Sequence, residues 1–228
     1  GASVGVGENI FDRVKLLLEA KADVIVIDDI YGYTPELIDT IKLVKKNFPD
    51  AQLIAGNVVT PDAVEELINA GADAIKIGFG TSSVSAAHII SGVGVPQLTA
   101  VLNCSVVAKK YDVPIISDGG IKYSGDITKV LAAGANVCML GNMFAGCEES
   151  PGQIELYQGR KYKIHKGLAE NNLEIVEGRV GYSGELQDIT NHLMEGLKSG
   201  LYYCGAETIE KLQQTAEFIK ITSAGANE

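Results

Sequence analysis

Apolar residues gather in short continuous runs that alternate with segments of helical periodicity. Three segments share one pattern, in which a small residue or glycine ends a helix and an apolar run then opens a strand: residues 20–28, 70–78 and 133–141. Apolar runs of this length suit strands that are covered on both faces. Further runs predict strands at residues 2–6, 52–55 and 114–117, which makes six strands in all.

Amphipathic helices are predicted between these strands. Apolar residues recur at 3.6-residue spacing within residues 11–18, 64–68 and 127–131. Thr34-Pro35 and Thr60-Pro61 each place an N-cap hydroxyl before a proline at the first helical position. The βαβα alternation predicts either a doubly wound sheet or a TIM-type (β/α) barrel. Glycine and polar residues follow strands all along the chain rather than at one switch point, and this favours the barrel.

The pattern changes at about Glu148. Residues 148–184 are a polar, glycine-containing excursion, in which residues 157–162 predict a small hairpin and residues 169–184 a loop. A final amphipathic helix is predicted from about Glu185 to Ser199. No interdomain linker is visible, so the prediction is a single β/α-barrel domain over residues 1–228, with 148–184 as a flap-like excursion.

Composition narrows the functional classes. The chain is 46% hydrophobic and 21% charged with a formal net charge of −10, and it lacks the concentrated basic face that nucleic-acid binding requires. No apolar run approaches the about 20 residues of a membrane span. The four cysteines form no CxxC pair and have no histidine at metal-binding spacing, so we expect a reducing cytoplasm.

Candidate chemistry lies where three strands end. Residues 78–85, 117–121 and 140–145 combine glycines with polar side chains, and each segment could turn backbone N–H groups toward an anion. A tight strand-to-helix turn explains any one of them equally well. In a barrel, however, all three meet at the C-terminal face, where Asp118 would suit a pair of sugar hydroxyls. A phosphorylated sugar is therefore the predicted ligand.

Several segments closely resemble the IMP dehydrogenase and GMP reductase family, and the resemblance covers nearly the whole chain. The matching segments include Ala55 to Thr60, Gly71 to Gly78, Gly92 to Gln97, Ser117 to Ile121 and Phe144 to Gly152. The phrases at residues 148–152, 155–160 and 218–225 look more like the dehydrogenase branch, whereas residues 31–34 look nearer to the reductase.

The resemblance implies roles for individual residues. A purine nucleoside monophosphate would bind through its phosphate and ribose, the nicotinamide cofactor NAD or NADP through its ribose, and a potassium ion through backbone carbonyls. The implied phosphate ligands are Ser83, Gly119, Gly120, Gly141 and Asn142, and Asp118 is the implied ribose ligand. The implied cofactor residues are Asp28 and Asn57, and the implied carbonyl donors to the cation are Gly78 and Gly80.

The implied reaction centre departs from the family pattern. Ser85 stands where the family has its cysteine nucleophile, and a serine hydroxyl is a poor nucleophile without an adjacent base. His88 could be that base or an ordinary surface histidine. Glu174 matches the family's catalytic-site glutamate, but the loop around it is too short for the dehydrogenase flap. The chain is also expected to begin at the family's third barrel strand.

Three hypotheses therefore stand together. The chain could be an oxidoreductase that converts IMP to XMP with NAD, or, as the alternative reaction, GMP to IMP with NADPH. It could be a catalytically silent nucleotide-binding protein that retains the phosphate and ribose ligands. It could also be an engineered or truncated family member. The resemblance also implies a homo-oligomer, which is a tetramer in the family.

Overall fold

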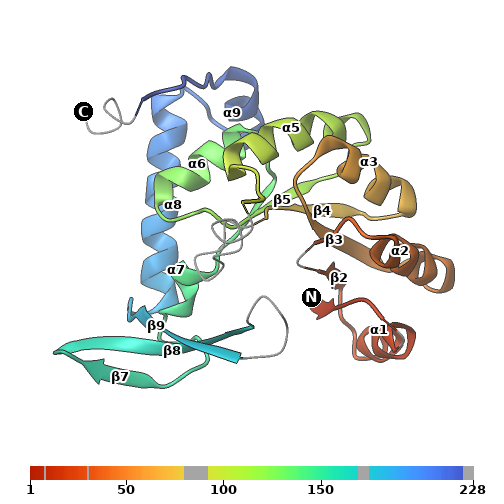
Figure 1. Cartoon of the computed structure of the whole chain (residues 1–228). Helices are drawn as coiled ribbons and strands as arrows, with labels where there is room; N and C mark the ends of the chain where they lie inside the picture. The colour runs from red at the N-terminus through yellow and green to blue at the C-terminus, as the bar shows by residue number, and fades with distance from the viewer. Residues whose placement is uncertain (8, 30, 80–91, 169–174, 223–228) are drawn as a thin grey trace.

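Residues 1–7, 9–29, 31–79, 92–168 and 175–222 are described by a computed structural model of the chain. Six strands form one parallel sheet in sequence order, and helices follow the strands along the chain (Figure 1). The strands are β1 (Ala2–Val4), β2 (Val24–Asp28), β3 (Gln52–Val58), β4 (Ala74–Ile77), β5 (Ile115–Asp118) and β6 (Val137–Met139). The predicted six parallel strands are confirmed.

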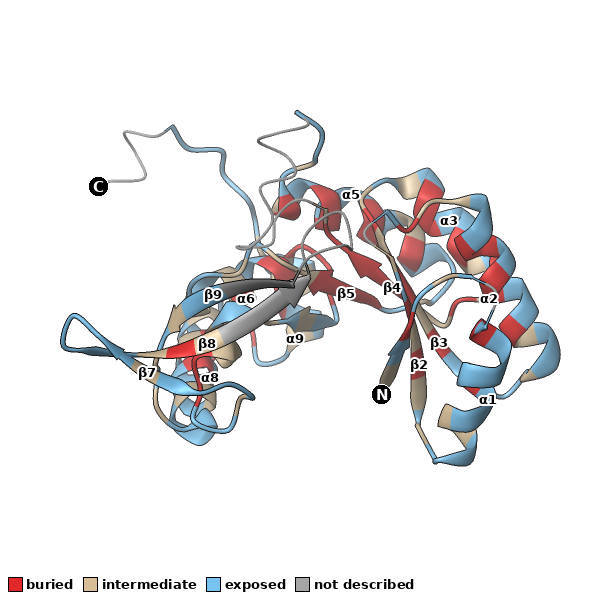
Figure 2. Ribbon diagram, turned by 60° about the horizontal axis from the view of Figure 1, so that its bottom comes forward, coloured by how far each residue is buried: buried red, intermediate tan, exposed pale blue. Residues whose placement is uncertain are grey.

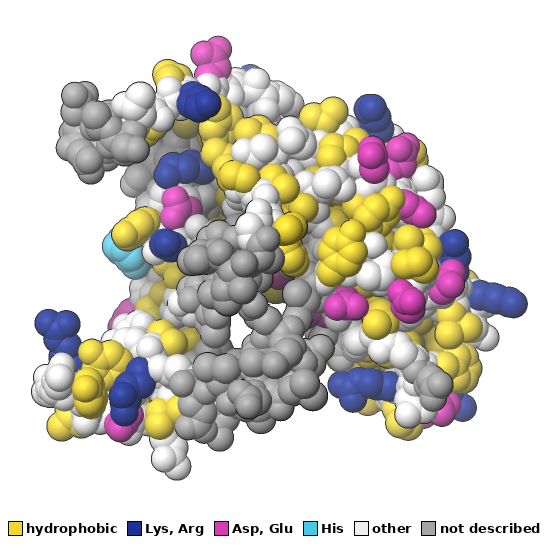
Figure 3. Space-filling view, in the orientation of Figure 1, with side chains coloured by type: hydrophobic (Ala, Val, Ile, Leu, Met, Phe, Trp, Pro, Cys, Tyr) yellow, Lys and Arg dark blue, Asp and Glu magenta, His cyan; other side chains and the backbone are white. Residues whose placement is uncertain are grey.

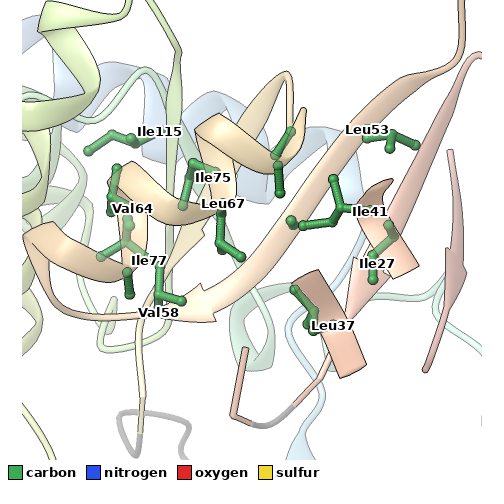
Figure 4. Packing of buried hydrophobic residues seen from close by; sticks show 14 of the residues in the cluster. Ile27, Leu37, Ile41, Leu53, Val58, Val64, Leu67, Ile75, Ile77 and Ile115 are labelled. Atoms are coloured by element: carbon green, nitrogen blue, oxygen red, sulfur yellow. The ribbon is translucent and has the colours of Figure 1, made fainter. Parts of the chain in front are cut away.

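The helices pack along one face of this sheet. They are α1 (Ile10–Glu19), α2 (Pro35–Asn47), α3 (Pro61–Ala70), α5 (Gln97–Lys110) and α6 (Ser124–Ala132). Figure 4 shows Ile75 and Ile77 of β4 against Val64 and Leu67 of α3, and all four side chains are fully buried. Burial of such branched apolar side chains on a twisted parallel sheet stabilises the layered α/β arrangement.

The first turns of the helices confirm part of the capping prediction. The Thr34 hydroxyl accepts a hydrogen bond from the Leu37 N–H at 3.2 Å, and Pro35 is the first residue of α2. Pro61 likewise opens α3, but the Thr60 side chain makes no capping hydrogen bond. The same Thr-Pro dipeptide therefore starts two helices, with a side-chain cap in only one of them.

A second, smaller sheet follows the barrel strands. Its antiparallel strands are β7 (Ile154–Tyr157), β8 (Arg160–Leu168) and β9 (Ile175–Gly181), and it lies to one side of the six-stranded sheet (Figure 2). The hairpin predicted at residues 157–162 is present as the β7–β8 turn. The loop predicted over residues 169–184 is wrong for residues 175–181, because this segment pairs with β8 through seven residues.

Three helices complete the described chain: α7 (Asn142–Ala145), α8 (Leu186–Tyr203) and α9 (Ile209–Thr215). α8 extends four residues beyond the predicted end at Ser199, because Leu201 packs against the second apolar cluster formed with α6 and α9. Among the described residues, no helix combines the length and apolar character needed to cross a membrane.

Candidate functional site

Three charged residues share the face of the sheet that the helices leave uncovered. Side chains alternate between the two faces of a strand, so Ile27 and Ile77 point toward the helices while Asp28 and Lys76 point to the other face. Asp118 lies on the same face at the end of β5. The carboxyl ends of β2, β4 and β5 thus bring these side chains together.

Lys76 is the centre of this cluster. Its Nζ lies 2.8 Å from Asp118 Oδ2 and 2.9 Å from Asp28 Oδ1, and its side chain is only 4% exposed. Burial alone lowers the pKa of Lys76, but the carboxylates of Asp118 and Asp28 outweigh burial and raise the pKa above its ordinary value. The lysine is therefore a charged ammonium, and it holds two carboxylates in fixed positions.

Asn57 joins the cluster because of an irregularity in β3. Simple alternation would place Asn57 on the helix side with Leu53 and Ala55. The register between β3 and β4 shifts between Gly56 and Val58, so Asn57 is an extra residue and Val58 takes the buried helix-side position. Asn57 Nδ2 consequently donates to Asp118 Oδ2 at 3.0 Å.

The other polar atom of the Asn57 amide lacks a partner in the described part of the chain. Its Oδ1 is buried and has no hydrogen-bond partner among the described residues. A buried acceptor without a donor costs about 1–3 kcal/mol, so a group that supplies a donor there gains affinity. Hydroxyl and amide N–H groups of a ligand have this chemistry.

The ends of β4 and β5 are held in close contact. A Cβ on Gly78 would collide with the carbonyl oxygen of Asp118, so only glycine permits this approach. From the other side, Gln97 Nε2 donates to the Ile77 carbonyl at 2.8 Å and to the Ser117 hydroxyl at 3.0 Å. These contacts fix the backbone beneath Asp118.

The glycines implied as phosphate ligands lie at two adjacent strand ends. Gly119 and Gly120 follow β5 with φ of 95° and 75°, a conformation that favours glycine. Gly141 and Asn142 follow β6, where Gly141 precedes α7 and Asn142 is its first residue; both are exposed. Because β5 and β6 are paired neighbours, both segments lie at the same edge as Asp118.

Five candidate site residues lie outside the described residues: Gly80, Ser83, Ser85, His88 and Glu174. The described part of the chain therefore contains the carboxylates implied to bind the two riboses and one implied cation ligand, Gly78, but not the position implied for the nucleophile.

Three cysteines of the described chain are poorly suited to replace that nucleophile. Burial raises the pKa of Cys104 to about 12 and that of Cys138 to about 11. Burial and then the Glu149 carboxylate raise the pKa of Cys147. A thiol with a raised pKa carries little thiolate at neutral pH, and the thiolate is the reactive form.

Lys76 and Gln97 are not among the site residues that the sequence predicts. Lys76 had a visible signal, since it is the one charged residue within the apolar strand Ala74–Ile77 and buried lysines require a partner. Gln97 had a weaker signal, a polar residue directly after Pro96, and the structure shows it to be the first residue of α5. Neither signal identifies the partner, which depends on strand order.

Comparison with known proteins identifies the family. The IMP dehydrogenase / GMP reductase domain matches residues 1–228. The chain belongs to this family. Inosine-5'-monophosphate dehydrogenases from Aquifex aeolicus and Bacillus subtilis are 46% and 42% identical to it, and the match covers all of this chain and 51% of each relative. This family member thus spans about half the length of the curated relatives that it matches.

A solved structure shares both sequence and fold. A cysteine-to-alanine variant of GMP reductase from Trypanosoma brucei, in complex with guanosine 5'-monophosphate, has a TM-score of 0.94 and 41% identity. The match covers 100% of this chain and 51% of that one. Similarity at this level confirms the TIM-barrel type of fold, of which this family member contains six parallel strands.

The visible surface of the molecule is mixed in charge. On the face drawn in Figure 3, Lys and Arg side chains are interspersed with Asp and Glu rather than gathered in one patch. The cluster itself presents carboxylate and amide oxygens at strand ends, and such a set of acceptors suits a ligand rich in hydroxyl groups.

Proposed function

We propose that this chain binds a purine nucleoside monophosphate at the carboxyl ends of its barrel strands, as part of an oxidoreductase of the IMP dehydrogenase type. The observation that carries the proposal is the cluster of Asp118, Asn57, Lys76 and Asp28 at those strand ends. The solved complex of the related GMP reductase with its nucleotide supports the same ligand class.

The ribose of the nucleotide would bind Asp118. Lys76 and Asn57 both donate to Oδ2 of Asp118, which leaves its other oxygen for the vicinal hydroxyls of the sugar. The phosphate would bind the N–H groups of Gly119 and Gly120, the Gly141–Asn142 segment and the hydroxyl of Ser83. Backbone N–H groups in glycine turns are suited to this role.

The nicotinamide cofactor would bind beside the nucleotide. The Asp28 side chain is 44% exposed and thus accessible to a second sugar, and the unpartnered Asn57 Oδ1 lies in the same cluster. Both groups are hydrogen-bond acceptors, so they fit the hydroxyl groups of a ribose. When bound, the cofactor would supply the hydride acceptor or donor, while the protein residues bind and orient both sugars.

Catalysis depends on residue 85. A serine at this position lacks the acidity of a cysteine, so we expect tight binding with little or no turnover in the chain as it stands. Conversion of IMP with NAD is the first reaction to test, and conversion of GMP with NADPH is the alternative. A homotetramer and a potassium ion on the Gly78 and Gly80 carbonyls are further parts of the proposal.

Calorimetric titration tests the binding proposal. We expect saturable binding of IMP or GMP, and a loss of affinity of at least about tenfold in Asp118→Ala, because a charged hydrogen-bond acceptor is removed. Asp62→Ala, which removes an exposed carboxylate in the first turn of α3, is the matched control and should bind as the unsubstituted chain does. No binding of IMP, GMP or XMP would refute the proposal.

Nicotinamide absorbance tests the catalytic part separately. We expect Ser85→Cys to gain turnover with IMP and NAD or with GMP and NADPH, and Ser85→Ala to match the unsubstituted chain. Equal turnover by the serine and cysteine forms would show that residue 85 is not the nucleophile. Binding without turnover in every form would favour the catalytically silent nucleotide-binding protein.

A further inference from the structure

Lys76 reaches its two carboxylate partners across the sheet. Asp28 pairs with Gly56, and Gly56 pairs with Lys76, so these three residues form one row across β2, β3 and β4. The middle residue has no side chain. A Cβ on Gly56 would lie 2.7 Å from Lys76 Cβ and 2.5 Å from the Lys76 carbonyl oxygen, which is closer than real contacts allow. Glycine at this position therefore lets the lysine pass over β3 and contact Asp28.

In the proposed function, the two carboxylate partners of Lys76 bind different ligands. Asp118 would contact the ribose of the mononucleotide, and Asp28 would contact the ribose of the cofactor. One ammonium holds both carboxylates at 2.8 Å and 2.9 Å. Without that ammonium, two carboxylates would lie on either side of an empty position, where like charges repel and each side chain gains freedom.

We propose that Lys76 is a positioning residue that couples the mononucleotide site to the cofactor site through its shared contacts with Asp118 and Asp28. The inference rests on the proposed function, because it assigns one ligand to each carboxylate. It predicts that a change at Asp28 alters the affinity for a mononucleotide that Asp28 does not touch. When Asp28 is removed, Asp118 is the one carboxylate partner of Lys76 that remains among the described residues, and the orientation of Asp118 becomes less fixed.

A double-mutant cycle tests this link. The affinity of IMP and of GMP, with no dinucleotide present, is measured by calorimetry in the 228-residue chain and in Asp28→Ala, Lys76→Met and the double variant. We expect Asp28→Ala to weaken mononucleotide binding by about fivefold or more, the lower end of typical coupling between sites. In the Lys76→Met background the same substitution should change affinity by less than about twofold. An equal effect in both backgrounds, or no effect of Asp28→Ala, overturns the proposal.

Two further variants separate positioning from general destabilisation. Asp73→Ala removes a carboxylate that pairs with Lys45 at 2.7 Å at the opposite end of the strands, and it should leave mononucleotide affinity unchanged. A loss equal to that of Asp28→Ala would overturn the proposal. Lys76→Arg keeps the positive charge and should retain more affinity than Lys76→Met, whereas equal losses would contradict a role for the charge.

The outcomes distinguish this inference from the proposed function. If the unsubstituted chain binds neither IMP nor GMP, both fail. If it binds a mononucleotide and the cycle shows no coupling, only the role of Lys76 fails. If Lys76→Met does not fold, the test relies on Asp28→Ala alone. The Asp28 side chain is 44% exposed, so its removal should not prevent folding. An unchanged mononucleotide affinity in Asp28→Ala then overturns the link.

Discussion

At the residue scale, Lys163 is a second buried lysine with a different kind of partner. Its Nζ donates to the carbonyl oxygens of Glu148 and Ser150 at 2.9 Å and of Gly152 at 3.2 Å, and the residue is 4% exposed. The three N–H groups of the Lys163 ammonium thus donate to three backbone carbonyl oxygens. These hydrogen bonds hold the backbone of the turn after α7 against β8, whereas Lys76 holds the side chains of Asp28 and Asp118.

We expect Lys163→Met to lower the free energy of unfolding by about 2 kcal/mol, because it leaves buried carbonyl groups without donors. Urea denaturation monitored by circular dichroism measures the change. Lys161→Met on the same strand is the control. Lys161 lies 5.5 Å from the Tyr182 ring centroid, and its loss should cost less than about 1 kcal/mol. Equal effects of the two substitutions would contradict this account.

At the element scale, α8 packs closely on α6 through two glycines one turn apart. A Cβ on Gly196 would collide with the Ser124 side chain, and one on Gly200 would collide with the side chain of Thr128. Helix propensity alone favours alanine over glycine by about 1 kcal/mol. The packing opposes this preference, since neighbouring backbones cannot separate without loss of the apolar cluster that α6, α8 and α9 share.

Gly196→Ala should therefore destabilise the protein by about 1–2 kcal/mol, because overpacking outweighs the gain in propensity. Thermal unfolding followed by calorimetry measures the effect. Ser199→Ala, at an exposed position of the same helix, should be neutral or slightly stabilising. An increase in melting temperature for Gly196→Ala would show that α8 and α6 adjust without cost.

The start of α6 carries a pH-dependent contribution. Burial raises the pKa of Asp126, but hydrogen bonds from the Lys122 and Tyr123 N–H groups and the Lys129 ammonium lower it below its ordinary value. A depressed pKa in the folded state means that the stabilisation is present above the unfolded pKa of about 4 and is lost as the pH falls through the folded value.

We expect Asp126→Asn to be less stable than the unsubstituted chain at neutral pH, by less than about 1 kcal/mol because the site is partly exposed. The difference should shrink toward zero when the pH is lowered below about 4. Urea titrations at a series of pH values measure it. A difference that is the same at all pH values would mean that charge is not involved.

At the scale of the whole molecule, the six-stranded sheet ends in two edges. Within the described residues, β1 and β6 each pair with a neighbour on one side only. On β6, Val137 is 51% exposed and Met139 is 39% exposed, whereas Ile116, the register partner of Val137 on β5, is 6% exposed. Exposed apolar edge strands promote association with further chains.

We therefore expect this 228-residue chain to self-associate as its concentration rises, and Val137→Lys with Met139→Lys to reduce the association, since edge lysines oppose strand pairing. Sedimentation velocity over a concentration series measures the average mass. Val106→Lys on α5, at a residue 59% exposed, is the control and should not change the association. A monomeric unsubstituted chain at all concentrations would contradict the expectation.

The sequence by itself determined the succession of the six parallel strands, the helices α1, α2, α3, α6 and α8, and the placement of Asp28 and Asp118 at strand ends. The reason is that a strand covered on both faces and a helix that buries one stripe each leave a recognisable pattern of apolar residues along the sequence. The same pattern and the family motifs led to the barrel and to the nucleotide-site hypothesis. Residues 175–181 lacked such a signal, because a short strand beside the core is defined mainly by its partner.

Only the tertiary structure decided how the site residues meet. The extra residue in β3 that turns Asn57 toward Asp118, and the passage of Lys76 over Gly56 to Asp28, depend on the register of strands distant in sequence. The contacts of Gly196 and Gly200 with α6 are likewise non-local. Local periodicity specifies which face a side chain occupies, but only the packing of neighbouring elements specifies which side chain it contacts there.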